Sequence, residues 1–250
     1  MEYRVCKNCV MDTSDPNIKF NANGICDHCQ TFYSHTLKNW SYKKKNNKLL
    51  AENLLSEIRK KGKNKDYDCI IGLSGGIDSS YLVYLAKEKF NLRPLVFHVD
   101  AGWNTELAVS NIQVLVEKLG LDLYTEVINW NEIKDLQLSF FKSGVPHIDA
   151  PQDHAFFATM YKFADKYNIK CILTGANLST ECIRNPVEWM YYQSDARQLK
   201  DIQKKHGTLK LKEFPTTYVL WHKLFLPYFR GIKIYKPLDY INYQKEEAVK

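Results

Sequence analysis

The sequence of 250 residues contains no long apolar run, and we expect no secretory leader. No stretch approaches the roughly 18 consecutive apolar residues that a membrane-spanning helix requires. The first residues, Met1 to Cys6, contain neither the basic region nor the apolar region of a secretory signal. We therefore expect a cytoplasmic protein that has no membrane partner.

No residue class is in excess either. Hydrophobic residues make up 45% of the chain and charged residues 25%, which excludes a disordered, collagen-like or coiled-coil protein. The sequence contains no internal repeat. Its length fits one full-sized domain together with a small accessory module.

The net charge of +7 is unevenly distributed along the chain. Residues 38–65 hold ten Lys and Arg against two Asp and Glu, and residues 197–236 hold the same numbers. Between them, residues 66–196 hold ten basic and seventeen acidic side chains. A net positive charge alone would suggest nucleic acid. Because the middle is acidic, we expect the two basic segments to face solvent, a protein partner or a charged substrate instead.

Four of the seven cysteines form two C-x2-C pairs near the N-terminus: Cys6, Cys9, Cys26 and Cys29. This spacing is typical of two knuckles that hold a structural zinc ion in a tetrahedron of thiolates. Asn23-Gly24, between the pairs, predicts a tight turn. Two disulfides are the alternative, which the missing secretory signal disfavours. His28 is a weaker candidate to replace one sulfur.

The rest of the chain alternates apolar strands with amphipathic helices. We expect strands over 69–74, 92–100, 122–129, 170–176 and 232–240, and helices over 46–61, 78–90, 105–119, 131–142 and 152–167. This alternation predicts an α/β fold, a doubly wound parallel five-stranded sheet with a small N-terminal zinc knuckle. Ligands of such sheets bind at the carboxyl ends of the strands, so the candidate site residues follow each strand.

The first strand is followed by a glycine- and serine-rich loop, Ser74-Gly75-Gly76-Ile77-Asp78-Ser79-Ser80. It is neither a Walker loop nor a G-x-G-x-x-G turn. The two glycines allow backbone N–H groups to point inward, and the start of the next helix favours an anion. The hydroxyls of Ser74, Ser79 and Ser80 add donors. Asp78 would hold a divalent cation between phosphate oxygens or cap the helix.

The S-G-G-x-D-S pattern resembles the signature of the N-type ATP pyrophosphatases, in the adenine nucleotide alpha hydrolase-like superfamily with its HUP-like fold. The resemblance implies that the loop binds ATP, which adenylates a substrate oxygen and releases pyrophosphate, before a nitrogen or sulfur nucleophile displaces AMP. It also implies further ATP contacts after the later strands and a magnesium ion held by Asp78 and Glu181. Those ATP contacts are Val99, Asp100, Gly175 and Asn177.

Over the whole chain, the sequence resembles the N-acetyl sugar amidotransferases of bacterial surface-polysaccharide (O-antigen lipopolysaccharide) and nonulosonic-acid biosynthesis. The segments that carry this resemblance are C-K-N-C-V-M-D-T, F-N-x-x-G-I-C-x-x-C, D-C-I-I-G-L-S-G-G-I-D-S-S and H-V-D-A-G-W-N. The resemblance implies conversion of an acetamido group into an acetamidino group on an N-acetylated sugar or sugar nucleotide. It also implies a chain that continues past Lys250.

This chemistry requires positioning and charge stabilisation rather than a side-chain nucleophile. Adenylation makes the amide oxygen a leaving group, and ammonia then displaces AMP, with Mg²⁺ neutralising phosphate charge. The predicted catalytic residues are Asp78, Asp153 and Glu181. Because Cys6 belongs to the zinc knuckle, it does not serve as a glutaminase nucleophile. Ammonia would come from a separate glutaminase subunit or from free ammonium.

Weaker candidates for substrate contacts are His154, Arg184 and Lys236. Asp153 and His154 begin a helix near the expected site, where either would orient ammonia or the sugar. The alternative is that Asp153 is a charge in the first turn of the helix and His154 a residue on the helix surface. Arg184, with Asn185, would contact a substrate phosphate or lie in a surface loop. Lys236 stands where the superfamily has an Arg-Pro-Leu sequence. We expect the aromatic and basic tract 221–230 to be an interface or core helix rather than a cover over the sugar.

The alternative function is a tRNA-thiolating ATP pyrophosphatase, since some of these enzymes also join a zinc module to this fold. Such enzymes need cysteines near the ATP, but residues 123–170 contain none and Cys171 should point into the core. That leaves Cys182 as the one candidate thiol. The expected parts of the chain are a zinc knuckle (1–37), a basic linker and helix (38–65), and an ATP pyrophosphatase domain with a basic, aromatic C-terminal region (66–250).

Overall fold

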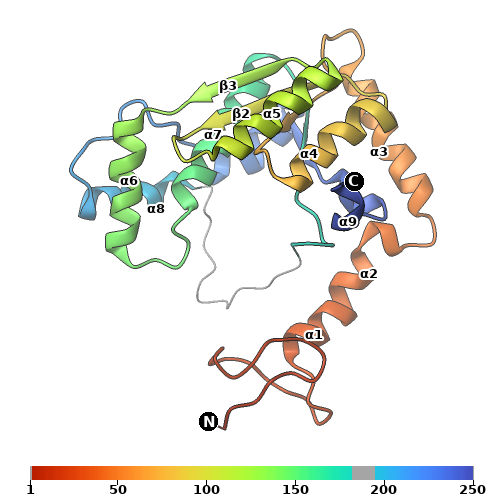
Figure 1. Ribbon diagram of the computed structural model, residues 1–250, viewed down its shortest axis with the longest axis vertical. Helices are drawn as coiled ribbons and strands as arrows, with labels where there is room; N and C mark the ends of the chain where they lie inside the picture. Colours follow the sequence, from red (N-terminus) through yellow and green to blue (C-terminus); the bar gives the residue numbers. More distant parts are fainter. Residues whose placement is uncertain (1, 182–194, 250) are drawn as a thin grey trace.

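The centre of the molecule is a five-stranded sheet with the strand order β3-β2-β1-β4-β5, and every neighbouring pair is parallel (Figure 1). The computed structural model describes residues 2–181 and 195–249, so that Cys182, Arg184 and Asn185 lie outside the described residues. The strands are β1 (Cys69–Gly72), β2 (Pro94–Asp100), β3 (Leu123–Val127), β4 (Cys171–Leu173) and β5 (Lys233–Tyr235). The predicted doubly wound, HUP-like α/β fold is confirmed.

Helices connect the strands and follow the last of them. Those before β4 are α3 (Asn47–Gly62), α4 (Ile77–Tyr84) continued by η3 (Leu85–Lys89), α5 (Glu106–Leu119), α6 (Trp130–Ser143) and α7 (Ala150–Lys166). Those after β4 are α8 (Ala196–His206), η5 (Trp221–Arg230), η6 (Pro237–Tyr240) and α9 (Lys245–Ala248). The helices expected from sequence periodicity are all present. Helix α8 was not predicted, although Asp195 accepts a hydrogen bond from the Arg197 N–H at its start and Gly207 follows its end.

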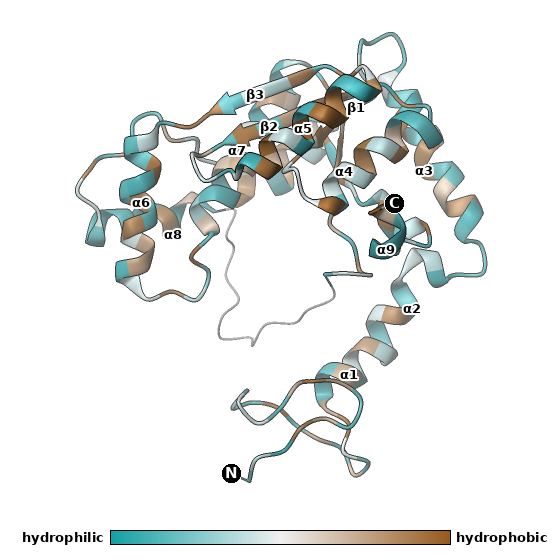
Figure 2. Ribbon diagram, in the orientation of Figure 1, coloured by the Kyte–Doolittle hydropathy of each residue, from teal (hydrophilic) through white to brown (hydrophobic). Residues whose placement is uncertain are grey.

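Two apolar cores lie on opposite faces of the sheet, because successive side chains of a strand point to opposite sides. Ile70 of β1 and Ile172 of β4 join the core formed with α6, α7, α8 and η5. Their neighbours Ile71 and Leu173 join the core formed with α3, α4 and α5. Figure 2 shows hydrophobic colour on β2 and on parts of α4 and α5, while the edge strand β3 is largely hydrophilic. Cover on both faces explains why the three central strands, β1, β2 and β4, are near-continuous apolar runs, whereas the edge strands β3 and β5 are mostly exposed.

Four strands, β1, β3, β4 and β5, end earlier than the sequence predicts. After β1, the Leu73 N–H still donates to the Phe97 carbonyl oxygen at 2.8 Å, and after β4 the Thr174 N–H donates to that of Tyr235 at 3.0 Å. The chain then turns away from the sheet in both places. Strand β5 ends at Tyr235 because Pro237 has no N–H to continue the pairing, and η6 begins there.

Two buried carboxylates on α6 hold the irregular segment that connects α8 to η5. Glu132 accepts hydrogen bonds from the backbone N–H groups of Lys212, Glu213 and Phe214. Asp135 accepts hydrogen bonds from the backbone N–H groups of Thr208 and Leu209. A buried carboxylate is costly without such donors, so these contacts fix the segment against α6.

The N-terminal residues form a small module of their own. The module is joined to α3 by α1 (Asp27–Thr31), η1 (Phe32–Thr36), α2 (Leu37–Asn39) and η2 (Ser41–Lys43). Figure 1 shows it at the end of this helical connection, away from the sheet. The turn predicted at Asn23-Gly24 is present, with Gly24 at a φ of 78°. Within the described part of the chain, no helix combines the length and apolar character that crossing a membrane would take.

Candidate functional site

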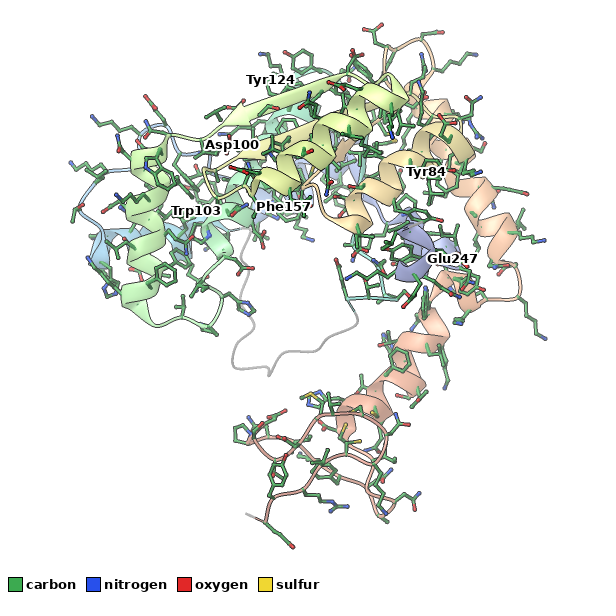
Figure 3. The ribbon with its side chains drawn as sticks, viewed as in Figure 1. Tyr84, Asp100, Trp103, Tyr124, Phe157 and Glu247 are labelled. Carbon is green, nitrogen blue, oxygen red and sulfur yellow. The ribbon has the colours of Figure 1, made fainter. Side chains whose placement is uncertain are left out.

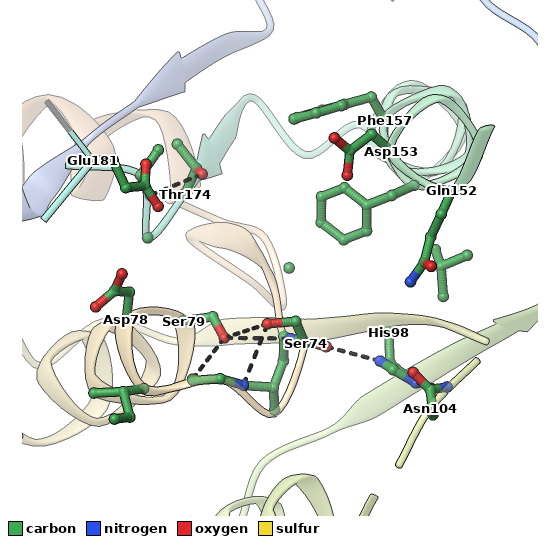
Figure 4. Close-up of a pocket in the computed structure, with 18 of the residues that line it drawn as sticks. Ser74, Asp78, Ser79, His98, Asn104, Gln152, Asp153, Phe157, Thr174 and Glu181 are labelled. Carbon is green, nitrogen blue, oxygen red and sulfur yellow. Dashed lines mark hydrogen bonds between the residues drawn. The ribbon is translucent and has the colours of Figure 1, made fainter. Parts of the chain in front are cut away.

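A cavity of about 560 Å³ opens at the carboxyl edge of the sheet. It lies at the ends of β1 and β4, where the strand order changes direction. Doubly wound sheets bind their ligands at this switch point. The walls come from the loop after β1, the end of β2, the loop after β4 and the first turns of α7 (Figure 4). The structure thus brings the ends of the predicted strands together around one space.

The loop after β1 turns sharply and presents the start of α4 to the cavity. Gly75 has a φ of 78°, and a Cβ atom there would lie 2.6 Å from the Ala108 carbonyl oxygen. The Ser79 hydroxyl donates to the Gly76 carbonyl oxygen at 3.1 Å, and the Ser74 hydroxyl accepts from the Gly76 N–H at 3.3 Å. Ser74, Gly76 and Ser79 all line the cavity. The positive end of the α4 dipole therefore faces the space where an anion would bind.

The loop after β4 packs directly against that helix start. A Cβ atom on Gly175 would lie 2.9 Å from the Ser79 backbone nitrogen and 3.0 Å from the carbonyl carbon of Asp78. Residues with a Cβ atom would push the two loops apart, so the close approach requires glycine. Thr174, Gly175 and Ala176 line the cavity beside the first turn of α4.

Two predicted magnesium ligands, Asp78 and Glu181, line the same side of the cavity (Figure 4). Asp78 Oδ2 accepts a hydrogen bond from the Thr180 hydroxyl at 3.2 Å, and Asp78 Oδ1 accepts one from the Tyr243 phenol. Glu181 Oε2 accepts from the Asn177 N–H at 3.4 Å. Each carboxylate keeps lone pairs for a cation. Since Mg²⁺ is usually held by one or two carboxylates plus substrate phosphates, this pair fits it.

The opposite wall comes from the first two turns of α7 (Figure 4). Gln152 and Asp153 lie one turn before Phe156 and Phe157, a spacing that places such pairs on one helix face. The two phenyl rings meet edge to face with centroids 5.3 Å apart. Burial, helped by the nearby charge of Asp149, raises the pKa of Asp153 to about 6. This wall therefore offers an apolar surface with one amide and one titratable carboxyl group.

Strand β2 contributes Val99, which was predicted, and His98, which was not. The buried His98 ring donates from Nδ1 to the Leu73 carbonyl oxygen at 2.8 Å, and its Nε2 accepts from the Asn104 amide at 3.1 Å. Asn104 also donates to Asp100 Oδ1 at 3.0 Å. His98 and Asn104 both line the cavity. Their positions at and just after the end of β2 are the sequence signal that would have identified them.

Several predicted residues support the cavity from behind. The Asp100 carboxylate accepts from the Gly102 N–H at 2.8 Å as well as from Asn104. Asn177 is buried, and its amide group binds the turn through Gly175 and Thr180. Gly75 and Ser80 complete the loop and the first turn of α4, but neither they nor Asp100 and Asn177 lie among the described lining residues.

Two of the three predicted substrate contacts, His154 and Lys236, are described, and neither lines the cavity. His154 is buried rather than at the helix surface, and its Nε2 accepts a hydrogen bond from the Thr217 N–H at 3.1 Å. Lys236 is exposed and lies outside the lining residues that the structure describes. Arg184 lies outside the described residues. Lys245 of α9, which the sequence analysis did not select, does line the cavity.

The aromatic and basic tract forms η5, as expected for a helix that packs on the core. His222 and Leu226 are buried, whereas Leu224, Tyr228 and Phe229 are exposed. No residue of η5 is among the described residues that line the cavity at the switch point. The tract therefore covers the core face shared with α7.

The four N-terminal cysteines meet as predicted: the Sγ atoms of Cys6, Cys9, Cys26 and Cys29 all lie within 4.8 Å of one another. None forms a disulfide. The Cys6–Cys29 and Cys9–Cys26 sulfur separations are 4.0 and 3.6 Å. Zinc–sulfur bonds of about 2.3 Å in a tetrahedron place sulfurs about 3.8 Å apart, so the donor set fits zinc.

Hydrogen bonds around the sulfurs favour the thiolate form of Cys6, whereas burial raises the pKa of Cys9 and of Cys26. The Cys26 N–H donates to Cys6 Sγ at 3.2 Å, and the Asn8 amide donates to Cys29 Sγ at 3.3 Å. Against the opposing effect of burial, the backbone donors lower the pKa of the Cys6 thiol to about 6. His28 does not point at the sulfurs as a ligand would, because its Nε2 pairs with Asp15 at 2.9 Å.

A family model described as asparagine synthase matches residues 33–176, which is more than half of the chain. The chain belongs to the asparagine synthase family. The matched residues of this asparagine synthase family member run from η1 to the loop after β4. They include the cavity walls formed by the loop after β1, the end of β2 and the start of α7. This supports the N-type ATP pyrophosphatase superfamily that the S-G-G-x-D-S loop indicated.

Two curated relatives match shorter stretches of this asparagine synthase family chain. Uncharacterized protein MJ1599 of Methanocaldococcus jannaschii is 31% identical over 119 residues, which cover 47% of this chain and 40% of the relative. The tRNA-specific 2-thiouridylase MnmA 2 of Fusobacterium nucleatum is 28% identical over 120 residues, which cover 45% of this chain and 34% of the relative. The chain thus spans two fifths or less of these relatives.

Among solved structures, the NMN synthetase of Francisella tularensis aligns with a TM-score of 0.40 and 22% identity, over 53% of this chain and 55% of its own. The NH3-dependent NAD synthetase of Campylobacter jejuni aligns with a TM-score of 0.41 and 16% identity, over 66% and 79%.

Proposed function

We propose that this chain is an ATP-dependent carbon–nitrogen ligase that converts the acetamido group of an N-acetylated sugar, free or nucleotide-linked, into an acetamidino group. The observation that supports it is one cavity with two unlike walls. An anion-binding helix start with Asp78 and Glu181 faces an apolar wall that carries Asp153. The first wall suits ATP and its metal, and the second suits a small acetamido group with its methyl against Phe156 and Phe157.

ATP would lie along the strand ends, with its phosphates at the loop after β1 and its adenosine toward β2. Ser74, Ser79 and the start of α4 offer hydroxyl and N–H donors to the phosphates. Val99, His98 and Asn104 line the β2 end of the cavity. Asp78 and Glu181 would hold Mg²⁺, which neutralises phosphate charge when bound.

The reaction is balanced without any other reactant. The acetamido oxygen attacks the α-phosphorus of ATP, and the bond to the β-phosphate oxygen breaks to release pyrophosphate. Ammonia then forms a C–N bond at the activated carbon, the C–O bond breaks, and AMP leaves with the original amide oxygen. The protein contributes alignment and charge stabilisation to both displacements.

Asp153 would accept the proton that ammonia loses as the amidine forms. Its pKa of about 6 lies close to the operating pH, where a general base is most effective. Since Cys6 lies in the cysteine cluster, a separate glutaminase subunit or free ammonium would supply the ammonia. The four thiolates would hold a structural zinc ion, because a complete set of protein ligands leaves no open position. The product suits bacterial surface-polysaccharide or nonulosonic-acid biosynthesis.

Thiolation of tRNA is the second candidate, and the relative named tRNA-specific 2-thiouridylase favours it. That chemistry needs an accessible thiol near the ATP. Cys69 and Cys171 are fully buried in the sheet, and burial raises the pKa of Cys171 to about 11. Thiolation would therefore rest on Cys182, which lies outside the described residues.

The deciding experiment follows the amide oxygen. The chain is incubated with Mg-ATP, ammonium and a panel of N-acetylated sugars and nucleotide sugars whose acetamido oxygen is ¹⁸O. We expect AMP that contains the label, unlabelled pyrophosphate, and a sugar lighter than its unlabelled form by about one mass unit. Formation of ADP and phosphate, or turnover only with tRNA and a sulfur donor, would contradict the proposal.

Matched variants separate the site from general damage. Asp78→Ala should abolish turnover. The zinc content of this variant should stay unchanged, since the four cysteines are remote from the loop after β1. Asp201→Ala, in an exposed i,i+4 pair on α8, should retain activity. Equal loss in both variants would point to unfolding rather than to chemistry.

A further inference from the structure

The chain after the sheet returns to the cavity and is fixed to the loop that follows β4. Asp239 Oδ1 accepts a hydrogen bond from the Leu178 N–H at 2.7 Å. The Ser179 hydroxyl donates to the Tyr243 carbonyl oxygen at 2.9 Å. Leu238 and Tyr243 are both buried in the core on the α4 side of the sheet. We call residues 237–248 the C-terminal segment.

Tyr243 connects this segment to Asp78. Its phenol donates a hydrogen bond to Asp78 Oδ1. The Thr180 hydroxyl donates one to Oδ2, the other oxygen of the same carboxylate. The Tyr243 ring packs on Tyr81 of α4 with centroids 5.5 Å apart. The orientation of the Asp78 carboxylate is thus set by two donors.

Lys245 places a positive charge at the cavity. Three carboxylates, those of Asp78, Asp153 and Glu181, line the same space. Among the lining residues that the structure describes, Lys245 is the one Lys or Arg. Glu246 and Glu247 follow it but are absent from that lining. Figure 3, where Glu247 marks α9 and Tyr84 marks α4, shows the two helices on the same side of the molecule.

We propose that the C-terminal segment completes the metal–nucleotide site. Tyr243 is a positioning residue that holds Asp78 in the orientation of a metal ligand, and Lys245 binds the phosphates of the nucleotide. A carboxylate oxygen that accepts one hydrogen bond keeps a lone pair for a metal, so the Tyr243 and Thr180 contacts persist beside a bound ion. Such supporting hydrogen bonds orient ligands and strengthen metal binding. The inference rests on ATP as the nucleotide of the proposed function, and not on the sugar.

The test measures binding of α,β-methylene-ATP, which is not cleaved between its α and β phosphates, to the full chain as Mn²⁺ or Mg²⁺ is titrated. Tyr243→Phe keeps the ring and removes only the hydroxyl. We expect it to raise the metal concentration for half-maximal nucleotide binding by about 10- to 100-fold. Tyr240→Phe is the matched control, since Tyr240 lies in the same segment and no described hydrogen bond uses its hydroxyl. It should leave the metal midpoint unchanged.

Lys245→Gln should weaken nucleotide binding about tenfold at saturating metal and reduce its dependence on salt, because one charge-assisted contact is lost. Lys118→Gln is its control, because Lys118 is exposed in the last turn of α5 and outside the described lining. A Tyr243→Phe variant with a lower melting temperature but an unchanged metal midpoint would overturn the role of Tyr243. Equal nucleotide affinity of the two lysine variants would overturn the role of Lys245. Nucleotide binding without sugar turnover by the unmodified chain would overturn the proposed function alone.

Discussion

Gly175→Ala tests whether the start of α4 is the nucleotide-binding element. The added methyl group would lie 2.9 Å from the Ser79 nitrogen and 3.0 Å from the Asp78 carbonyl carbon. Both are backbone atoms, so no side chain can rotate away to relieve the contact. The loop after β4 and the first turn of α4 must therefore separate by several tenths of an ångström. That shift moves the N–H groups that would face the phosphates.

The expected magnitude has two parts. Overpacking of this kind costs about 1–3 kcal/mol in the free energy of unfolding. For a chain of this size each kcal/mol lowers the melting temperature by about 2–4 °C. A displaced hydrogen bond to a charged phosphate costs about 1.5–3 kcal/mol of binding free energy, so ATP affinity should fall by about tenfold or more. Thermal unfolding and calorimetric titration with Mg-ATP measure the two effects separately.

Gly144→Ala provides the control. Gly144 ends α6 at a φ of 67°, and a Cβ atom there would meet nothing within 4 Å. Alanine in this left-handed conformation costs about 1–2 kcal/mol through backbone strain alone. The two variants should therefore lose similar stability, while only Gly175→Ala loses ATP affinity. If Gly175→Ala binds ATP as tightly as Gly144→Ala, the start of α4 does not hold the phosphates and the reasoning fails.

Three further predictions concern zinc, acid stability and the pH profile. Cys26→Ser should lose the bound zinc, measured by atomic absorption, yet keep ATP binding because the two sites are separate. The hydrogen bond from Arg197 lowers the pKa of Asp195 to about 2, so this carboxylate stabilises the fold above its unfolded pKa and loses that effect as pH falls through 2. Asp195→Asn should therefore lower the free energy of unfolding, measured with urea, by about 1 kcal/mol at pH 7 and by progressively less between about pH 4 and 2. An equally large loss at pH 2 would contradict this. Since burial raises the pKa of Asp153 to about 6, its ionised form should make the rate rise between pH 5 and 7 when the concentration of free ammonia is held constant, and Asp153→Asn should be slower with that rise absent; a retained rise at constant free ammonia would assign the titration elsewhere.

The loop after β1 was predictable because its chemistry is local. Two glycines, three serines and an aspartate follow one apolar strand, and the backbone conformation they permit depends on neighbours in the chain. The same holds for the cysteine cluster, since the pair spacing sets the geometry. The sheet was predictable for a related reason: strands buried on both faces are short apolar runs between amphipathic helices.

The contacts of Tyr243 and Lys245 were beyond the reach of such reasoning. Tyr243 meets Asp78 across 165 positions of the chain, and nothing in the sequence near either residue encodes that distance. The surface position considered for His154 was wrong for the same reason. Its place on a helix start suggested a surface or substrate role, but tertiary packing buries it against the segment around Thr217. Helix periodicity predicts which residues share a face, whereas the neighbours of that face depend on the whole fold.

The charge distribution explains why the C-terminal segment matters to the site. The cavity is built mainly from the acidic middle of the chain and carries three carboxylates. Basic side chains nearby in sequence are engaged elsewhere: Arg197 pairs with Asp195, Arg230 with Asp165, and Lys61 with Glu57. A polyanionic nucleotide could not bind among these carboxylates unless cations offset their repulsion, since like charges destabilise one another at short range. A metal held by Asp78 and Glu181, as proposed above, would provide one such charge. Lys245 supplies a second one, since it is the one Lys or Arg among the lining residues that the structure describes.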